Sequence, residues 1–145
     1  MGEYKTICPY EELKRGLGIM EKQVAVLIDG DNISAKYAES IKQEALQYGN
    51  IKVFRLYGSV NSPNTKKWYP VMPRQGIMPV LQISYASGKS IADQALTIDA
   101  MDLLHSEGID VFCIASSDSD FTKLVYRLKE SGKVVIGMGE SKTKE

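Results

Sequence analysis

Short apolar runs that alternate with helix-like segments constrain the fold of this 145-residue chain more than any other feature. The run over residues 24–28 is continuously apolar, and residues 109–115 form a second such stretch, broken only by Asp110. Strands of this kind are buried on both faces, as in parallel sheets whose strands are connected by helices. We therefore predict an α/β protein, a three-layer sandwich with a mainly parallel five-stranded sheet.

The spacing of apolar residues gives the expected elements in order. Strands are predicted at residues 24–28, 51–57, 80–83, 109–115 and 133–137. Helices are predicted at residues 34–48, 90–105 and 120–130. Between them, the prolines Pro63, Pro70 and Pro73 permit only broken helical turns over residues 62–75.

The length and composition bound the kind of protein. We assign one domain to residues 20–145 and an N-terminal extension to residues 1–19. Eighteen basic and eighteen acidic side chains give zero net charge, so no overall basic surface indicates nucleic-acid binding. The longest apolar runs are too short for a membrane helix, and Cys8 and Cys113 do not indicate a disulfide framework. A cytoplasmic protein is expected, and its one histidine, His105, excludes a histidine pair.

Acidic residues follow three of the predicted strands. Asp29 comes directly after the first strand, Asp118 and Asp120 follow the fourth, and Asp93 lies in the first turn of the helix after the third. The carboxyl ends of parallel strands meet at one edge, where open α/β sheets place their ligand sites. We expect Asp29, Asp93 and Asp118 to form one cluster with Asp120. Asn32 either begins the first helix or orients Asp29, a metal-bound water or the substrate. Converging carboxylates are the hard oxygen ligands that Mg²⁺ or Mn²⁺ prefers.

Each of these segments also has a plainer interpretation. Residues 116–119 are good helix N-cap residues, and acids in a first turn are favoured by the helix dipole. The segment Asp29-Gly-Asp31-Asn32 is also typical of a turn. Capping and turn formation explain each segment alone, but not why acids follow three strands at one edge, so we favour a metal site.

Asp99 needs a separate assignment, because it lies about 240° around the helix from Asp93. Its neighbours on that arc are mostly apolar, so a carboxylate there needs partners. Asp99 is either a supporting group near the site or a paired core acid, and the sequence leaves both open. We expect replacement of Asp93 to remove metal affinity at little cost in stability, and replacement of a buried, paired Asp99 to lower stability.

Substrate contacts are predicted at residues that flank the acids. Gly88 before Lys89 and Asp93 after it would let the lysine ammonium reach a bound phosphate, although a solvated loop lysine is the commoner case. Ser117 and Arg55 are the other two predicted contacts. Further candidates for a basic and aromatic rim, each individually explained as a surface side chain, are Lys66, Lys67, Trp68, Arg74, Lys123 and Arg127.

Six short motifs follow one another along the chain. They are Val-Leu-Ile-Asp29-Gly-Asp-Asn32, Arg55-Leu-Tyr-Gly58, Gly88-Lys-Ser-Ile-Ala-Asp93, Thr97-Ile-Asp99-Ala-Met-Asp-Leu-Leu104, Ser116-Ser-Asp-Ser-Asp-Phe121 and Val135-Ile-Gly-Met-Gly139. Any one of them is weak, but all six in this order resemble the NYN domain family of PIN-like ribonucleases, specifically its bacterial LabA-like branch. The resemblance covers about residues 22–143.

This resemblance implies a PIN-like, Rossmann-like fold and a ribonuclease that hydrolyses RNA phosphodiester bonds with Mg²⁺ or Mn²⁺. It carries over Asp29, Asp93, Asp118 and Asp120 as the acidic site, with Asn32 beside Asp29. Members of the branch often continue into a small RNA-binding winged-helix module, which is an expected partner beyond this chain, and a homodimer is left open. Ions held by the carboxylates would activate water and neutralise charge on the phosphate, without a side-chain nucleophile.

Two other functions fit parts of the sequence. Asp29-Gly-Asp31 is the Asp-x-Asp of haloacid-dehalogenase-type phosphatases, with Asp29 as the covalent nucleophile. That family places Thr two residues after the second acid, whereas Ser34 lies three residues after Asp31. The other alternative is a non-catalytic RNA- or protein-binding module of the same fold, with which the zero net charge agrees.

Overall fold

A five-stranded sheet with the order β3-β2-β1-β4-β5 forms the centre of the molecule. The computed structural model describes residues 21–83, 91–106, 108–117 and 121–139. The strands are β1 (Gln23–Asp29), β2 (Asn50–Ser59), β3 (Met78–Gln82), β4 (Val111–Ala115) and β5 (Val134–Met138). All four pairings between neighbouring strands are parallel, so the predicted five-stranded α/β fold is confirmed.

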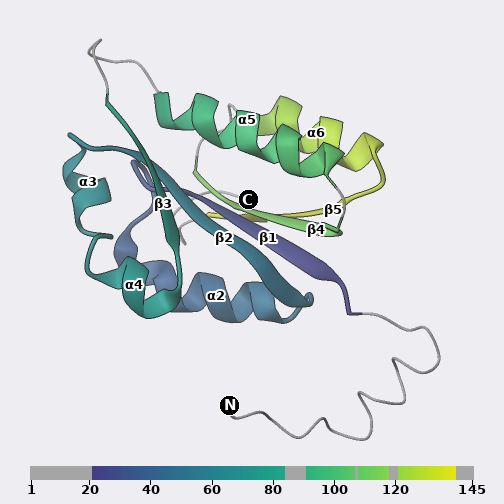
Figure 1. The fold of residues 1–145 in the computed structure, drawn as a ribbon, viewed down its shortest axis with the longest axis horizontal. Helices are drawn as coiled ribbons and strands as arrows, with labels where there is room; N and C mark the ends of the chain where they lie inside the picture. The colour runs from purple at the N-terminus through teal and green to yellow at the C-terminus, as the bar shows by residue number, and fades with distance from the viewer. Residues whose placement is uncertain (1–20, 84–90, 107, 118–120, 140–145) are drawn as a thin grey trace, which may run out of the picture.

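Helices cover both faces of the sheet (Figure 1). α5 (Ile91–His105) and α6 (Thr122–Glu130) lie on one face. The other face carries η1 (Ala35–Tyr37), α2 (Ala38–Leu46), α3 (Pro63–Lys66) and α4 (Val71–Gln75). This is the predicted three-layer sandwich, and α3 and α4 are the broken turns expected over residues 62–75. None of the described helices is long and apolar enough to cross a membrane.

β1 lies in the middle of the sheet and divides the core into two parts. Val24, Val26 and Ile28 pack in the cluster that α2 and α4 complete, whereas Ala25 and Leu27 pack under α5 and α6. All five side chains are 0% exposed, which explains why this run is apolar at every position rather than at alternate positions.

Two strands begin two residues away from their predicted starts, for local reasons, and the other three differ by one residue. β3 begins at Met78 rather than at residue 80, although Pro79 lies within it. Proline is tolerated there because β3 is an edge strand and needs no backbone donor on its outer side. β4 begins at Val111 rather than at residue 109, because the side chain of Asp110 turns to the start of β1, where Gln23 N donates to its Oδ2 at 2.8 Å.

The order of the strands reverses between β1 and β4. From β1 the chain passes to β2 and β3 on one side, and it later returns to β4 and β5 on the other side. Residues 24–28 of β1 pair with residues 111–115 of β4. In open α/β sheets the crevice at such a reversal, outside the carboxyl ends of the strands, holds the ligand. The segments that follow β1 and β4 therefore frame the expected position of a site.

Candidate functional site

A buried aspartate ends β1 at the reversal of strand order. Asp29 is 1% exposed, and its Oδ2 accepts hydrogen bonds from Asn32 Nδ2 at 2.8 Å and from Ser116 Oγ at 3.1 Å. Ser116 directly follows β4, so the segments after the two central strands meet at this carboxylate. Donors from two different segments fix the orientation of the carboxylate. The predicted partnership of Asn32 with Asp29 is present, whereas the contact from Ser116 was not predicted.

The turn after Asp29 is held against β2. Asn32 N donates to the Asp29 carbonyl at 3.2 Å, and Gly30 N donates to the Tyr57 carbonyl at 2.7 Å. A Cβ atom on Gly30 would lie 2.8 Å from Leu56 Cδ2, so a larger residue would push the turn away from the strand. The segment is a turn, as its composition indicates, and the same turn presents Asn32 to the carboxylate.

Asp31, the second acid of that turn, has partners inside the fold. Its Oδ1 accepts hydrogen bonds from Ser59 N at 2.9 Å and from Thr65 Oγ1 at 2.6 Å. Thr65 is fully buried and packs directly on Gly58, where a Cβ atom would collide with it. Asp31 therefore joins the turn after β1 to the end of β2 and to α3.

We expect Asp31→Asn to leave stability nearly unchanged and Asp31→Ala to lower the free energy of unfolding by about 1–3 kcal/mol. Asn keeps an oxygen that can accept both hydrogen bonds, whereas Ala leaves the buried Thr65 hydroxyl and the Ser59 N–H without this acceptor. Urea unfolding followed by circular dichroism measures the difference. Equal losses for the two variants would show that the charge of Asp31, rather than its acceptor oxygen, stabilises the fold.

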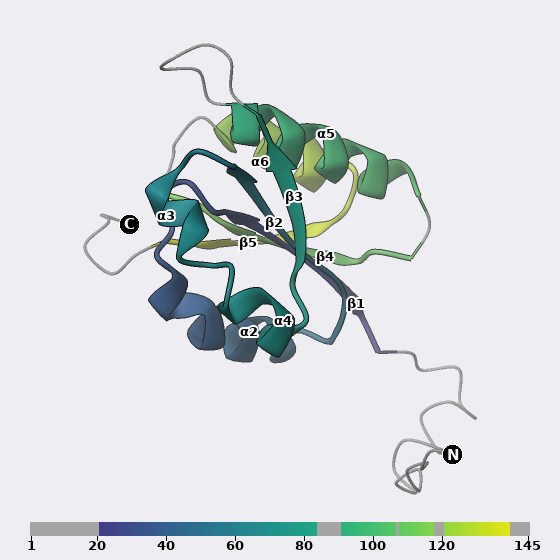
Figure 2. The same cartoon turned by 60° about the vertical axis from the view of Figure 1, so that its left-hand side comes forward.

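α3 supports the same turn and lies beside the carboxyl ends of β1 and β2 (Figure 2). Asn64 Nδ2 donates to the carbonyls of Gly30 and Ile33 at 2.7 and 2.8 Å, and Trp68 Nε1 donates to the Ile33 carbonyl at 2.8 Å. Trp68 is 0% exposed, so its assignment to an aromatic rim is wrong, and it is a core residue. No local pattern predicts these contacts, because the partners are 31 to 35 residues apart in the sequence.

Asp99 is a paired acid in the middle of α5. Its Oδ2 accepts hydrogen bonds from Arg55 Nη1 at 2.9 Å and from Tyr57 Oη at 2.7 Å. Burial, together with the neighbouring Asp99, raises the pKa of the Tyr57 hydroxyl, which therefore remains a donor at neutral pH. Of the two alternatives for Asp99, these contacts support the paired acid. Arg55 forms an ion pair with Asp99, and its contact with a substrate stays a prediction.

The other predicted site residues are only partly within the described chain. Asp93 lies in the first turn of α5, on the face of the sheet that Ala25 and Leu27 of β1 also face, and it is partly buried. Ser117 is exposed just after β4. Among the described residues, no three His, Cys, Asp or Glu side chains are grouped closely enough to hold a metal ion, so the acidic cluster stays a prediction. The predicted site residues outside the described chain are Lys89, Asp118 and Asp120.

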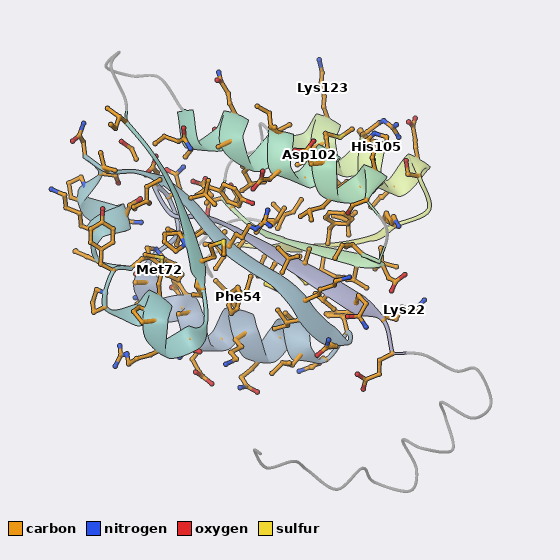
Figure 3. The ribbon with its side chains drawn as sticks, viewed as in Figure 1. Lys22, Phe54, Met72, Asp102, His105 and Lys123 are labelled. Atoms are coloured by element: carbon orange, nitrogen blue, oxygen red, sulfur yellow. The ribbon has the colours of Figure 1, made fainter. Side chains whose placement is uncertain are left out.

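The donor atoms at this edge suit a hard divalent cation. Asp29 and Asp93 offer carboxylate oxygens, and Asn32 and Ser116 offer an amide and a hydroxyl beside Asp29. Oxygen ligands of this kind are those that Mg²⁺ and Mn²⁺ prefer. His105 lies at the end of α5 opposite to Asp93, so it is too far from the acidic residues to act as a general base there (Figure 3). The described residues therefore fit chemistry that depends on carboxylates.

Known proteins share this sequence pattern and fold. Residues 23–145 match the NYN domain family. An uncharacterized protein of Methanocaldococcus jannaschii is 28% identical over 134 residues, which cover 90% of this chain and 52% of that protein. The chain thus spans about half the length of this curated relative. The crystal structure of a protein of unknown function from Vibrio parahaemolyticus shares the fold, with a TM-score of 0.63 and 20% identity over 86% of this chain and 85% of that one.

Proposed function

The chain belongs to the NYN domain family, a family of PIN-like nucleases, and we propose that it is a metal-dependent ribonuclease. The observation that carries this proposal is the buried Asp29 carboxylate at the reversal of strand order, held by donors from Asn32 and Ser116. The residues that we assign to the acidic site, which would hold Mg²⁺ or Mn²⁺, are Asp29, Asp93, Asp118 and Asp120.

The residues around Asp29 prepare the carboxylate for this task. Asn32 and Ser116 hold it in one orientation, so little reorganisation is needed when a cation binds. Asp93 adds a carboxylate from the first turn of α5, the helix that covers the face of the sheet on which Ala25 and Leu27 lie. When bound, the cation supplies a Lewis acid that activates water and offsets charge on the phosphate.

Substrate contacts follow from the basic and polar residues near the acids. Lys89 and Ser117 are the contacts that we propose for the RNA phosphates. Arg55 is a weaker candidate, because the carboxylate of Asp99 already offsets its charge at 2.9 Å. A winged-helix RNA-binding module, a homodimer and a cytoplasmic location remain predictions from the sequence.

Removal of the metal tests the proposal. The purified chain should cleave 5′-labelled single-stranded or structured RNA in Mn²⁺, because the acidic site requires a cation to bind and activate the phosphate. EDTA should abolish cleavage, and added Mn²⁺ should restore it. Failure to cleave any RNA of a broad panel in either Mg²⁺ or Mn²⁺ would favour the non-catalytic binding module.

The phosphatase alternative conflicts with the contacts of Asp31. In an Asp-x-Asp phosphatase the second acid would act beside Asp29, but here Ser59 N and Thr65 Oγ1 both donate to Asp31 Oδ1. We therefore propose that Asp31 is structural, and that Asp31→Asn retains cleavage of RNA. Hydrolysis of p-nitrophenyl phosphate that Asp31→Asn abolishes would support the phosphatase instead.

A further inference from the structure

A hollow of about 340 Å³ lies between α6 and the carboxyl end of β5. Figure 1 shows α6 running along the part of the sheet that β4 and β5 form. A cavity of this size is within the range that takes a small ligand. One face of α6, at positions 122, 125, 126 and 129, forms its wall, and the other residues that line it are Ile114, Ser116, Phe121 and Gly137.

The hollow exists because Gly137 has no side chain. In β5 this glycine pairs with Ile114 of β4, whose side chain belongs to the core under α6. A Cβ atom on Gly137 would meet no atom within 4 Å. The floor of the hollow is therefore open at this position, and the first carbon of a side chain there would enter the space without contacting a neighbour.

The hollow adjoins the proposed acidic site through one side chain. Ser116 lines the hollow, and its Oγ donates to Asp29 Oδ2 at 3.1 Å. A group bound in the hollow would therefore lie beside Asp29, the carboxylate that we propose to hold the cation at the cleaved phosphate.

The lining combines the features that bind a nucleotide of a single strand. Tyr126 is 64% exposed and stands beside the apolar side chains of Val125 and Ile114. Lys129, one turn further along α6, brings a positive charge to the same rim. The helix has three basic residues and one acidic residue, although the whole chain has zero net charge. Aromatic side chains stack on bases, and basic ones contact phosphates.

We propose that this hollow binds a base of single-stranded RNA next to the cleaved phosphate. The proposal rests on the function proposed above and deepens it by assigning a second contact to the substrate. Tyr126 stacks on the base over the floor that Gly137 leaves open, and Lys129 contacts the adjoining phosphate. Ser116 joins this contact to Asp29.

Two variants test the hollow by different routes. Gly137→Val fills the floor, and valine suits a strand, so the melting temperature should not fall. Tyr126→Ala removes the stacking surface from an exposed position. Fluorescence anisotropy in EDTA measures the Kd of the full chain for a labelled ten-nucleotide RNA and for a ribose-phosphate oligomer of equal length without bases.

The ratio of these two Kd values reports binding of bases. Stacking of one base corresponds to roughly a tenfold change or more in affinity. Each variant should therefore lower the preference for the RNA over the baseless oligomer about tenfold. Lys129→Ala should weaken binding to both oligomers. Its matched control is Lys22→Ala, which removes the same charge from an exposed position just before β1 that does not line the hollow (Figure 3).

Tyr69→Ala is the control for Tyr126→Ala, because Tyr69 is 39% exposed between α3 and α4, away from the hollow. A wild-type preference for bases in both Gly137→Val and Tyr126→Ala, or no such preference in the wild type, would overturn the proposal. Cleavage of RNA in Mn²⁺ is assayed in parallel. Binding that depends on bases without cleavage would support the hollow and overturn the ribonuclease, whereas cleavage without that dependence would do the reverse.

Discussion

Replacing Asp29 by Asn is expected to lower the rate of Mn²⁺-dependent RNA cleavage at least about a hundredfold. The amide has the size of the carboxylate, and its oxygen can still accept hydrogen bonds from Asn32 and Ser116, but it lacks the charge that binds a cation. Because its shape is kept and a buried charge is removed, the variant should remain folded. Initial rates on labelled RNA and the rise in Tm on addition of Mn²⁺ measure the effect, and both should be lost.

Asp102→Asn is the matched control for this experiment. Asp102 is an exposed acid of α5, and its replacement removes the same charge (Figure 3). The control should keep both the rate and the Mn²⁺-dependent shift in Tm. Cleavage that persists unchanged in Asp29→Asn would identify a contaminating nuclease, and loss of cleavage with an intact shift would place the cation elsewhere.

Replacing Asp99 by Ala is expected to lower the free energy of unfolding by about 1–3 kcal/mol. The change leaves the Tyr57 hydroxyl and the Arg55 guanidinium without the carboxylate that joins them. The ion pair itself contributes the smaller part, because the side chains of Arg55 and Asp99 are 29% and 26% exposed and solvent screens them. The larger part comes from the hydroxyl of Tyr57, which is fully buried in β2. Thermal and urea unfolding measure the loss.

The exposed Asp102→Ala on the same helix should unfold like the wild type. Asp93→Asn should show the opposite behaviour to Asp99→Ala, with little loss of stability and no shift in Tm on addition of Mn²⁺. If Asp99→Ala melts like the wild type and loses the Mn²⁺-dependent shift, then Asp99 belongs to the metal site and the division of roles is wrong.

The parts of the fold that were predicted correctly are those with a signal in neighbouring residues. The continuous apolar run of β1 indicates a strand that is buried on both faces, and the structure places it in the middle of the sheet. The turn after Asp29 has the composition of a turn, and the prolines over residues 62–75 divide α3 from α4. In each case the interactions that form the element are between neighbouring residues, so the composition and spacing of the sequence predict it.

The contacts that were missed join residues far apart in the sequence. Ser116 and Asp29 are 87 residues apart, and Arg55 and Asp99 are 44 apart. The strand order brings the first pair together, and the packing of α5 on β2 brings the second together. For Ser116 a signal did exist, because it continues the series of Phe112 and Ile114, whose side chains face α5 and α6.

The pairing of Asp99 also determines where the first turn of α5 stands above the sheet. A helix is stiff along its axis, and Asp93 and Asp99 are six residues, or about 9 Å, apart along it. Arg55 and Tyr57 of β2 hold the helix at Asp99, and these contacts fix the position of α5 along its axis relative to the sheet. A slip of one turn would carry Asp93 about 5.4 Å along the axis. Arg55 and Tyr57, in the middle of β2, thus determine where the carboxylate of Asp93 lies at the edge of the sheet.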